Sequence, residues 1–189
     1  RDRRWWNDTE TPDLSTSESI DPRPFTKALD DILPAERVVA IDSGNFMGYP
    51  STYLRVPDHM GFCFTQAFQS IGLGLSSGIG AALAQPDRLA VIGTGDGGFM
   101  MGISELETAV RLGRPLLIAV YNDAAYGAEV HHFEHLPHDG DAVNLSTVTF
   151  PDIDIAAIAE GFGARGVTVR TLADMDEVRR WASAPNGVM

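Results

Sequence analysis

The sequence has one cysteine, few basic side chains and no long apolar run. Cys63 is the only cysteine among 189 residues, so no internal disulfide can form, which fits a reducing, cytoplasmic setting. Lys and Arg number 14 against 26 Asp and Glu, giving a formal net charge of −12. This balance argues against binding nucleic acid through clustered cations, but it is compatible with a small phosphorylated ligand held by backbone N–H groups and a metal.

No apolar run reaches membrane-spanning length and the first residues lack a signal-peptide core, so we expect no membrane contact.

The composition along the chain predicts an arm followed by one domain. Residues 1–22 are polar and contain several prolines, which is typical of a linker or extended arm. Residues 23–189 have the length and apolar content of a single α/β domain. Because the chain opens on Arg1 and closes where a new apolar run begins at Gly187, we expect this domain to be truncated at both ends.

Apolar patterning predicts strands that alternate with helices. Short buried strands are expected at residues 38–41, 62–64, 89–93, 115–121 and 166–169, and helices at 24–33, 103–112, 153–160 and 175–182. This alternation predicts an α/β fold of three layers, a mostly parallel sheet with helices on both faces. Ligands of such sheets bind at the carboxyl ends of the strands.

Two aspartates follow neighbouring predicted strands. Asp96 lies between glycines after one strand, and Asp123 follows the next strand 27 residues later, the length of one crossover. Carboxylate oxygens at one sheet edge suit Mg²⁺, and Gly95, Gly97 and Gly98 would let backbone N–H groups approach a diphosphate. Alone, Gly-Asp-Gly is also a common turn sequence, but its pairing with Asn122-Asp123 at this spacing favours a metal and phosphate site.

These residues resemble the thiamine-diphosphate motif, in which GDG is closed by an NN or ND pair. Asp42-Ser43-Gly44-Asn45 is similar to the first diphosphate loop of that family, and residues 70–74 and 78–82 are similar to its glycine-rich segment. The resemblance covers residues 20–185 and is strongest to the C-terminal domains of acetolactate-synthase-like, benzoylformate-decarboxylase-like and pyruvate-decarboxylase-like enzymes. It implies the thiamine-diphosphate-binding fold.

The resemblance also implies roles for individual residues. Asp96, Asp123 and the backbone carbonyl of Ala125 match the protein ligands of Mg²⁺. The positions that match the cofactor contacts are Ser43, Gly44, Asn45, Gln69, Ile71, Gly95, Gly97, Gly98 and Tyr126. Among these, Ile71 matches the apolar residue that props the cofactor into a bent shape, and the Gln69 carbonyl matches an acceptor for its aminopyrimidine.

Three positions depart from the family pattern. Asp123 stands where Asn is usual, which adds negative charge to the metal site. Gly98 replaces a frequent Ser and keeps only the backbone N–H. Phe46 stands where acetolactate synthases usually carry His, which counts against that particular activity.

The residues after the metal loop carry two further hypotheses. Glu129 matches a catalytic glutamate of pyruvate decarboxylases and sulfoacetaldehyde acetyltransferases and could relay protons; the alternative is a solvated helix residue. His131, His132, His135 and His138 form a weak zinc candidate, because no cysteine joins them and no firm helix is predicted there. One histidine in a substrate pocket, or ordinary polar contacts, are the alternatives.

The function implied by the resemblance is decarboxylation or carboligation of a 2-keto acid with thiamine diphosphate and Mg²⁺. The family's activating glutamate belongs to a pyrimidine-binding domain, of the same or a partner subunit, which this chain does not contain. We therefore expect an incomplete active site and a homodimeric or homotetrameric assembly. A non-catalytic thiamine-diphosphate-binding or regulatory subunit is the alternative. A nucleotide-binding oxidoreductase is disfavoured, since residues 93–98 do not have the Rossmann spacing.

Overall fold

The centre of the molecule is a four-stranded parallel sheet. The computed structural model describes residues 6–68, 70–135 and 143–189. The strands are β1 (Arg37–Ile41), β2 (Phe62–Phe64), β3 (Leu89–Gly95) and β4 (Leu116–Tyr121), in the order β2-β1-β3-β4 with every neighbouring pair parallel. Strands β1 and β3 are almost entirely buried, because both faces of the sheet are covered by helices.

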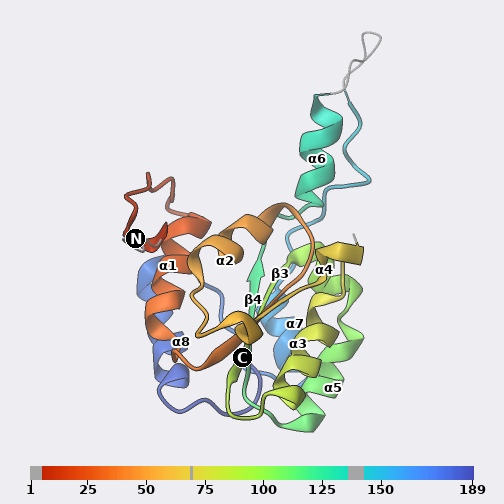
Figure 1. Ribbon diagram of the computed structural model, residues 1–189. Coiled ribbons are helices and arrows are strands. Elements are labelled where there is room, and N and C mark those ends of the chain that lie inside the picture. The colour runs from red at the N-terminus through yellow and green to blue at the C-terminus, as the bar shows by residue number, and fades with distance from the viewer. Residues whose placement is uncertain (1–5, 69, 136–142) are drawn as a thin grey trace.

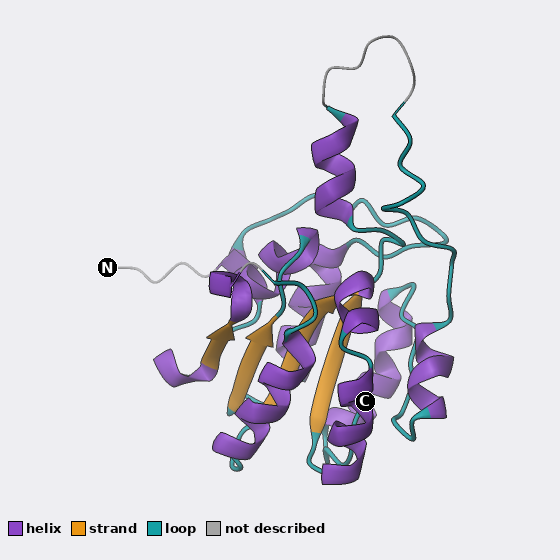
Figure 2. Ribbon diagram, turned by 90° about the vertical axis from the view of Figure 1, so that its right-hand side faces the viewer, coloured by secondary structure: helices purple, strands orange, loops and turns teal. Residues whose placement is uncertain are grey.

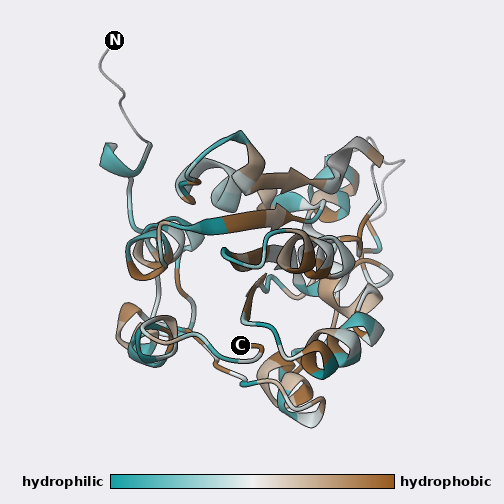
Figure 3. Cartoon of the chain, turned by 60° about the horizontal axis from the view of Figure 1, so that its bottom comes forward, coloured by the Kyte–Doolittle hydropathy of each residue, from teal (hydrophilic) through white to brown (hydrophobic). Residues whose placement is uncertain are grey.

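Helices cover both faces of this sheet, which confirms the three-layer α/β prediction (Figures 1 and 2). They are α1 (Pro22–Ile32), α2 (Gly48–Tyr53), α3 (Gly74–Ala84), α4 (Asp96–Met101), α5 (Ser104–Leu112), α6 (Gly127–Glu134), α7 (Ile155–Gly161) and α8 (Met175–Ala182). Helices α1 and α8 contribute Leu29 and Trp181 to one core cluster, while α3, α5 and α7 pack on the opposite face. Figure 3 shows the strands mostly in hydrophobic colours between these layers.

A buried ion-pair network closes the amino-terminal end of β1. The carboxylate of Asp30 on α1 pairs with the guanidinium groups of Arg37 and Arg55, and Asp30 is fully enclosed. The side-chain amide of Asn7 donates to the Asp30 carboxylate at 2.7 Å and to the Tyr53 carbonyl at 2.9 Å. Part of the polar arm is thus fastened to the body of the domain.

The strand predicted at residues 166–169 is wrong, because these residues belong to no strand of the sheet. The backbone of β4 instead forms hydrogen bonds with the last residue of the sequence. Ile118 N–H donates to the Met189 carbonyl at 2.7 Å, and Met189 N–H donates to the Leu116 carbonyl at 2.9 Å. Val167 and Val169 still pack against the core. Their alternating pattern therefore reflects burial and not strand pairing.

Candidate functional site

The two predicted metal-binding aspartates follow adjacent strands at one edge of the sheet. Gly95 at the end of β3 lies opposite Tyr121 at the end of β4, so Asp96 and Asp123 leave the sheet from the same side. The backbone N–H of Ala125 donates to Asp96 Oδ2 at 3.2 Å. The loop after β4 is therefore bonded directly to the turn after β3.

The electrostatics of this edge disfavour two ionised carboxylates. Asp96 is only 3% exposed; this burial raises its pKa to about 6, and the nearby charge of Asp123 adds to the rise, against hydrogen bonds from backbone N–H groups. Burial also raises the pKa of Asp123, although its side chain reaches solvent at the mouth of the site. A cation between the two carboxylates would offset the energetic cost of ionising both of them.

The loop that carries Asp123 has a strained backbone. Ala124 adopts φ +54°, a left-handed conformation that costs an L-residue of order 1 kcal/mol. Its N–H donates to the Asn122 side chain at 3.0 Å, and its carbonyl accepts from Phe150 N–H at 2.7 Å. These bonds hold the turn in place, and strain of this kind is typical of ligand-binding loops.

The glycines around Asp96 are required by the protein's own side chains. A Cβ on Gly97 would lie 2.5 Å from the Tyr126 ring, which itself packs edge-on against Phe150 with centroids 4.6 Å apart. A Cβ on Gly98 would lie 2.5 Å from Asp42 Oδ2. At both positions a larger residue would force one of these side chains to shift even without a ligand, a constraint that the sequence prediction had ascribed to the diphosphate alone.

The loop after β1 approaches the same edge. Gly44 adopts φ +151°, which favours glycine, and the side chain of Asn45 hydrogen-bonds to Asp123. Phe46 is buried, stacks on Tyr121 with centroids 5.5 Å apart, and would contact a Cβ on Gly95 at 3.1 Å. At this departure from the family pattern, the phenyl ring is therefore part of the floor beneath the site.

The described residues that were predicted for metal, cofactor or catalysis line one shallow hollow. They are Ser43, Gly44, Asn45, Ile71, Gly95, Asp96, Gly97, Gly98, Asp123, Ala125, Tyr126 and Glu129. Gln69 lies outside the described residues. The hollow thus gathers residues from the loop after β1, the segment that carries Ile71, the turn from β3 into α4, the loop after β4 and the start of α6.

Helix α6 rises from this edge of the sheet, away from the other layers (Figures 1 and 2). It carries Glu129 in its first turn and His131 and His132 in its last turn, so the expectation that no firm helix holds the histidines is wrong for these two. Burial raises the pKa of Asp123, while hydrogen bonds, the largest of them from Ala125 N–H, and the neighbouring His131 lower it to a smaller extent. No group of three or more metal-binding side chains occurs within the described ranges, and His138 lies outside them.

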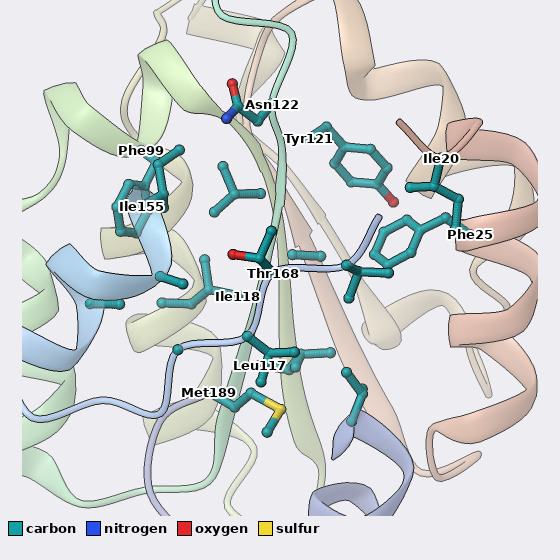
Figure 4. Close-up of a pocket in the computed structure, with 18 of the residues that line it drawn as sticks. Ile20, Phe25, Phe99, Leu117, Ile118, Tyr121, Asn122, Ile155, Thr168 and Met189 are labelled. Carbon is teal, nitrogen blue, oxygen red and sulfur yellow. The ribbon is translucent and has the colours of Figure 1, made fainter. Parts of the chain in front are cut away.

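A larger cavity lies along the flank of β4. Its volume is about 750 Å³, and Figure 4 shows Leu117 and Ile118 from β4, Ile155 from α7, and Met189 on its walls. Polar residues such as Asn122, Asp123 and Arg165 also line this cavity, but only the hollow at the strand ends brings Asp96 and Asp123 together with the glycine turn. We therefore place the candidate site in the hollow at the strand ends.

Sequence reasoning missed the importance of one further side chain. Asp42, predicted only as the first residue of a loop, is completely buried at the end of β1 and accepts hydrogen bonds from several segments of the site. The available signal was an acidic residue placed immediately after a buried strand.

The fold and the hollow define an α/β domain whose candidate ligand site lies at the carboxyl edge of a doubly covered parallel sheet. Residues 42–189 match the family model described as the thiamine pyrophosphate enzyme C-terminal TPP binding domain. The chain belongs to this family. In the part of the chain that the structure describes, no helix has the length and apolarity needed to cross a membrane.

Characterised relatives support the same family. An acetolactate synthase of Bacillus subtilis is 33% identical over 164 residues, 87% of this chain and 28% of the relative. A sulfoacetaldehyde acetyltransferase of Alcaligenes xylosoxydans is 31% identical over 82% of this chain and 25% of the relative. A thiamine diphosphate-dependent 4-hydroxybenzoylformate decarboxylase from Rhodococcus jostii matches the fold with a TM-score of 0.78 and 24% identity, covering 95% of this chain and 33% of that protein. The chain thus spans a quarter to a third of these relatives.

Proposed function

We propose that this chain binds the diphosphate of thiamine diphosphate through Mg²⁺, held by the side chains of Asp96 and Asp123 and the backbone carbonyl of Ala125. The observation that carries the proposal is the meeting of two carboxylates with raised pKa values at one sheet edge. Oxygen ligands of this kind suit Mg²⁺, which also accepts phosphate oxygens. The residues present therefore fit the group that the family implies.

The remaining residues of the hollow would anchor and shape the cofactor. Backbone N–H groups of the Gly97–Gly98 turn and of the loop at Gly44, which line the hollow, would contact phosphate oxygens. Ile71 supplies an apolar wall beside Gly98. Glu129 lines the same hollow and would transfer a proton to or from bound substrate.

The proposed reaction is decarboxylation of a 2-keto acid or carboligation from it. When bound, thiamine diphosphate supplies a carbon nucleophile that adds to the substrate carbonyl, chemistry that belongs to the cofactor. A pyrimidine-binding domain, on the same or a partner subunit, would complete the active site in a homodimer or homotetramer. The names of the relatives, acetolactate synthase and sulfoacetaldehyde acetyltransferase, support carboligation as well as decarboxylation.

Isothermal titration with thiamine diphosphate and Mg²⁺ tests the binding proposal on the protein as naturally expressed. We expect Asp96→Ala and Asp123→Ala to lose detectable binding because each removes a charged metal ligand. Asp87→Asn is the matched control, since it changes one exposed carboxylate at the opposite end of β3. Unchanged affinity in both Ala variants would contradict the metal assignment.

Turnover of a 2-keto acid such as pyruvate then separates an enzyme from a non-catalytic binding subunit. Glu129→Gln keeps the size of the side chain but cannot exchange a proton at neutral pH. We expect it to retain cofactor affinity and to lower the catalytic rate about 10²-fold or more. An unaltered rate would assign Glu129 to the solvated surface of α6.

A further inference from the structure

Asp42 holds together three segments that surround the candidate site. Its carboxylate accepts hydrogen bonds from Gly72 N–H, at 2.9 Å to Oδ2 and 3.1 Å to Oδ1, and from Ser43 N–H at 2.8 Å. The Thr94 hydroxyl donates to Oδ2 at 3.3 Å. The side chain is fully enclosed, so these protein donors replace the water that an ionised carboxylate would otherwise bind.

The neighbouring backbone leaves space for this carboxylate. A Cβ on Gly74 would lie 2.7 Å from Asp42 Cβ, and a Cβ on Gly98 would lie 2.5 Å from Asp42 Oδ2. Gly72 itself has φ +92°, a conformation that presents its N–H to Asp42 and that L-residues rarely adopt. Three glycines from two separate motifs thus accommodate one acidic side chain.

The position of Asp42 distinguishes it from a ligand-binding group. It is not among the residues that line the hollow, and its oxygens are occupied by donors from the protein interior. One of its partners, Gly72, directly follows Ile71, whose Cγ2 lies 3.2 Å from the Cβ position of Gly98. A change at Asp42 would therefore reach the site through the segment that carries Ile71.

We propose that Asp42 is a positioning residue that fixes the Ile71 segment against the Gly95–Gly98 turn and so sets where the ring portion of the cofactor lies relative to its diphosphate. The inference rests on the proposed function, because it requires a ligand with both parts. It predicts that substitution of Asp42 lowers the affinity for thiamine diphosphate more than the affinity for inorganic pyrophosphate, which has no ring to place.

The first test compares the affinities of these two ligands, each with Mg²⁺, in the protein as naturally expressed. Asp42→Asn keeps the volume but replaces one acceptor oxygen by an NH2 donor, which would face the N–H and O–H donors that Asp42 now accepts from. If the whole energy of one hydrogen bond to the Asp42 carboxylate is used to place the Ile71 segment, its loss corresponds to at most about a tenfold to hundredfold change in affinity. We expect a loss in this range for thiamine diphosphate and less than about threefold for pyrophosphate.

Asp21→Asn is the matched control, since it also alters a buried carboxylate, at the start of α1. It should lower the melting temperature without changing the ratio of the two affinities. Equal losses for both ligands in Asp42→Asn would show a merely structural role and overturn the inference. If the unaltered protein fails to bind thiamine diphosphate, the proposed function fails first, and the two failures are thereby distinguished.

A second test asks whether Asp42 is the reason for glycine at position 98, and it needs no ligand. Gly98→Ala alone should lower the melting temperature markedly, since the new methyl group meets the enclosed carboxylate. In the background of Asp42→Ala the same substitution should cost much less, because the nearest obstructing atoms have been removed. An equal shift in both backgrounds would refute the predicted coupling.

Discussion

Replacing Asp96 by Asn should stabilise the metal-free protein at neutral pH while abolishing its response to Mg²⁺. The pKa of Asp96 is raised from 3.8 to about 6 in the folded state, a rise of about 2 units, and each unit corresponds to about 1.4 kcal/mol. The folded protein then binds the Asp96 proton more tightly than the unfolded chain does. Well below pH 3.8, Asp96 is protonated in both states and does not lower the free energy of unfolding. The free energy of unfolding then falls as the pH rises from about 3.8 to about 6.

The size of the effect follows from the same two pKa values. Ionised Asp96 should reduce the free energy of unfolding by about 1.6 kcal/mol at pH 5 and by up to about 3 kcal/mol at pH 7.5. Asn carries no charge and avoids this penalty, although it retains only one acceptor oxygen for the donors that Asp96 uses, such as Ala125 N–H. We therefore expect Asp96→Asn to be more stable by about 1–3 kcal/mol at pH 7.5, with a smaller difference at pH 5.

Urea unfolding in the presence of a chelator, at pH 5 and pH 7.5, measures these differences. Other groups titrate in both proteins, so the comparison between them isolates Asp96. Adding Mg²⁺ and thiamine diphosphate should stabilise the unaltered protein and leave Asp96→Asn unaffected. A variant that is less stable than the unaltered protein at pH 7.5, or a difference that does not grow with pH, would refute the reasoning.

Two further predictions concern the framework that supports the site. Gly78→Ala should destabilise the protein by about 1–3 kcal/mol, because the new Cβ would overlap Ile92 on β3. Gly80→Ala in the same helix has open space around it and should stabilise the protein by up to about 1 kcal/mol. Thermal unfolding of the two variants measures both effects, and equal effects would contradict the prediction. Asp30→Asn should cost about 3–5 kcal/mol because it leaves the guanidinium of Arg37 buried without a carboxylate, and a loss below 1 kcal/mol in urea unfolding would show that the network is dispensable.

The meeting of Asp96 and Asp123 at one edge of the sheet was predictable because its main signals are local in sequence. Asp96 and Asp123 each follow a buried apolar strand, and parallel strands separated by one crossover bring their carboxyl ends to the same edge. The sheet itself was predictable for the same reason. Residues 166–169 misled the prediction, since Val167 and Val169 alternate as in a strand but are only packed against the core.

The parts that escaped prediction depend on contacts between distant segments. Asp42 is 30 residues from Gly72 and 52 from Thr94, and nothing in the local sequence shows that these groups meet. No firm helix was predicted around Glu129 either, because α6 has little apolar periodicity and stands apart from the core. Tertiary contacts, not local propensity, decide such features.

Contacts between distant segments also give a second reason for the glycines at positions 97 and 98. A diphosphate-binding turn needs glycine only if a ligand approaches the backbone closely, yet here Gly97 faces the ring of Tyr126 and Gly98 faces the carboxylate of Asp42. A larger residue at either position would therefore displace a side chain of the ligand-free protein, and the turn is shaped before the cofactor arrives. A binding site that is already formed loses less conformational entropy when it binds. Substitution of these glycines should consequently reduce both the stability of the protein and its affinity for the cofactor. Substitution of Asp96 by Asn should instead raise the stability while removing the affinity.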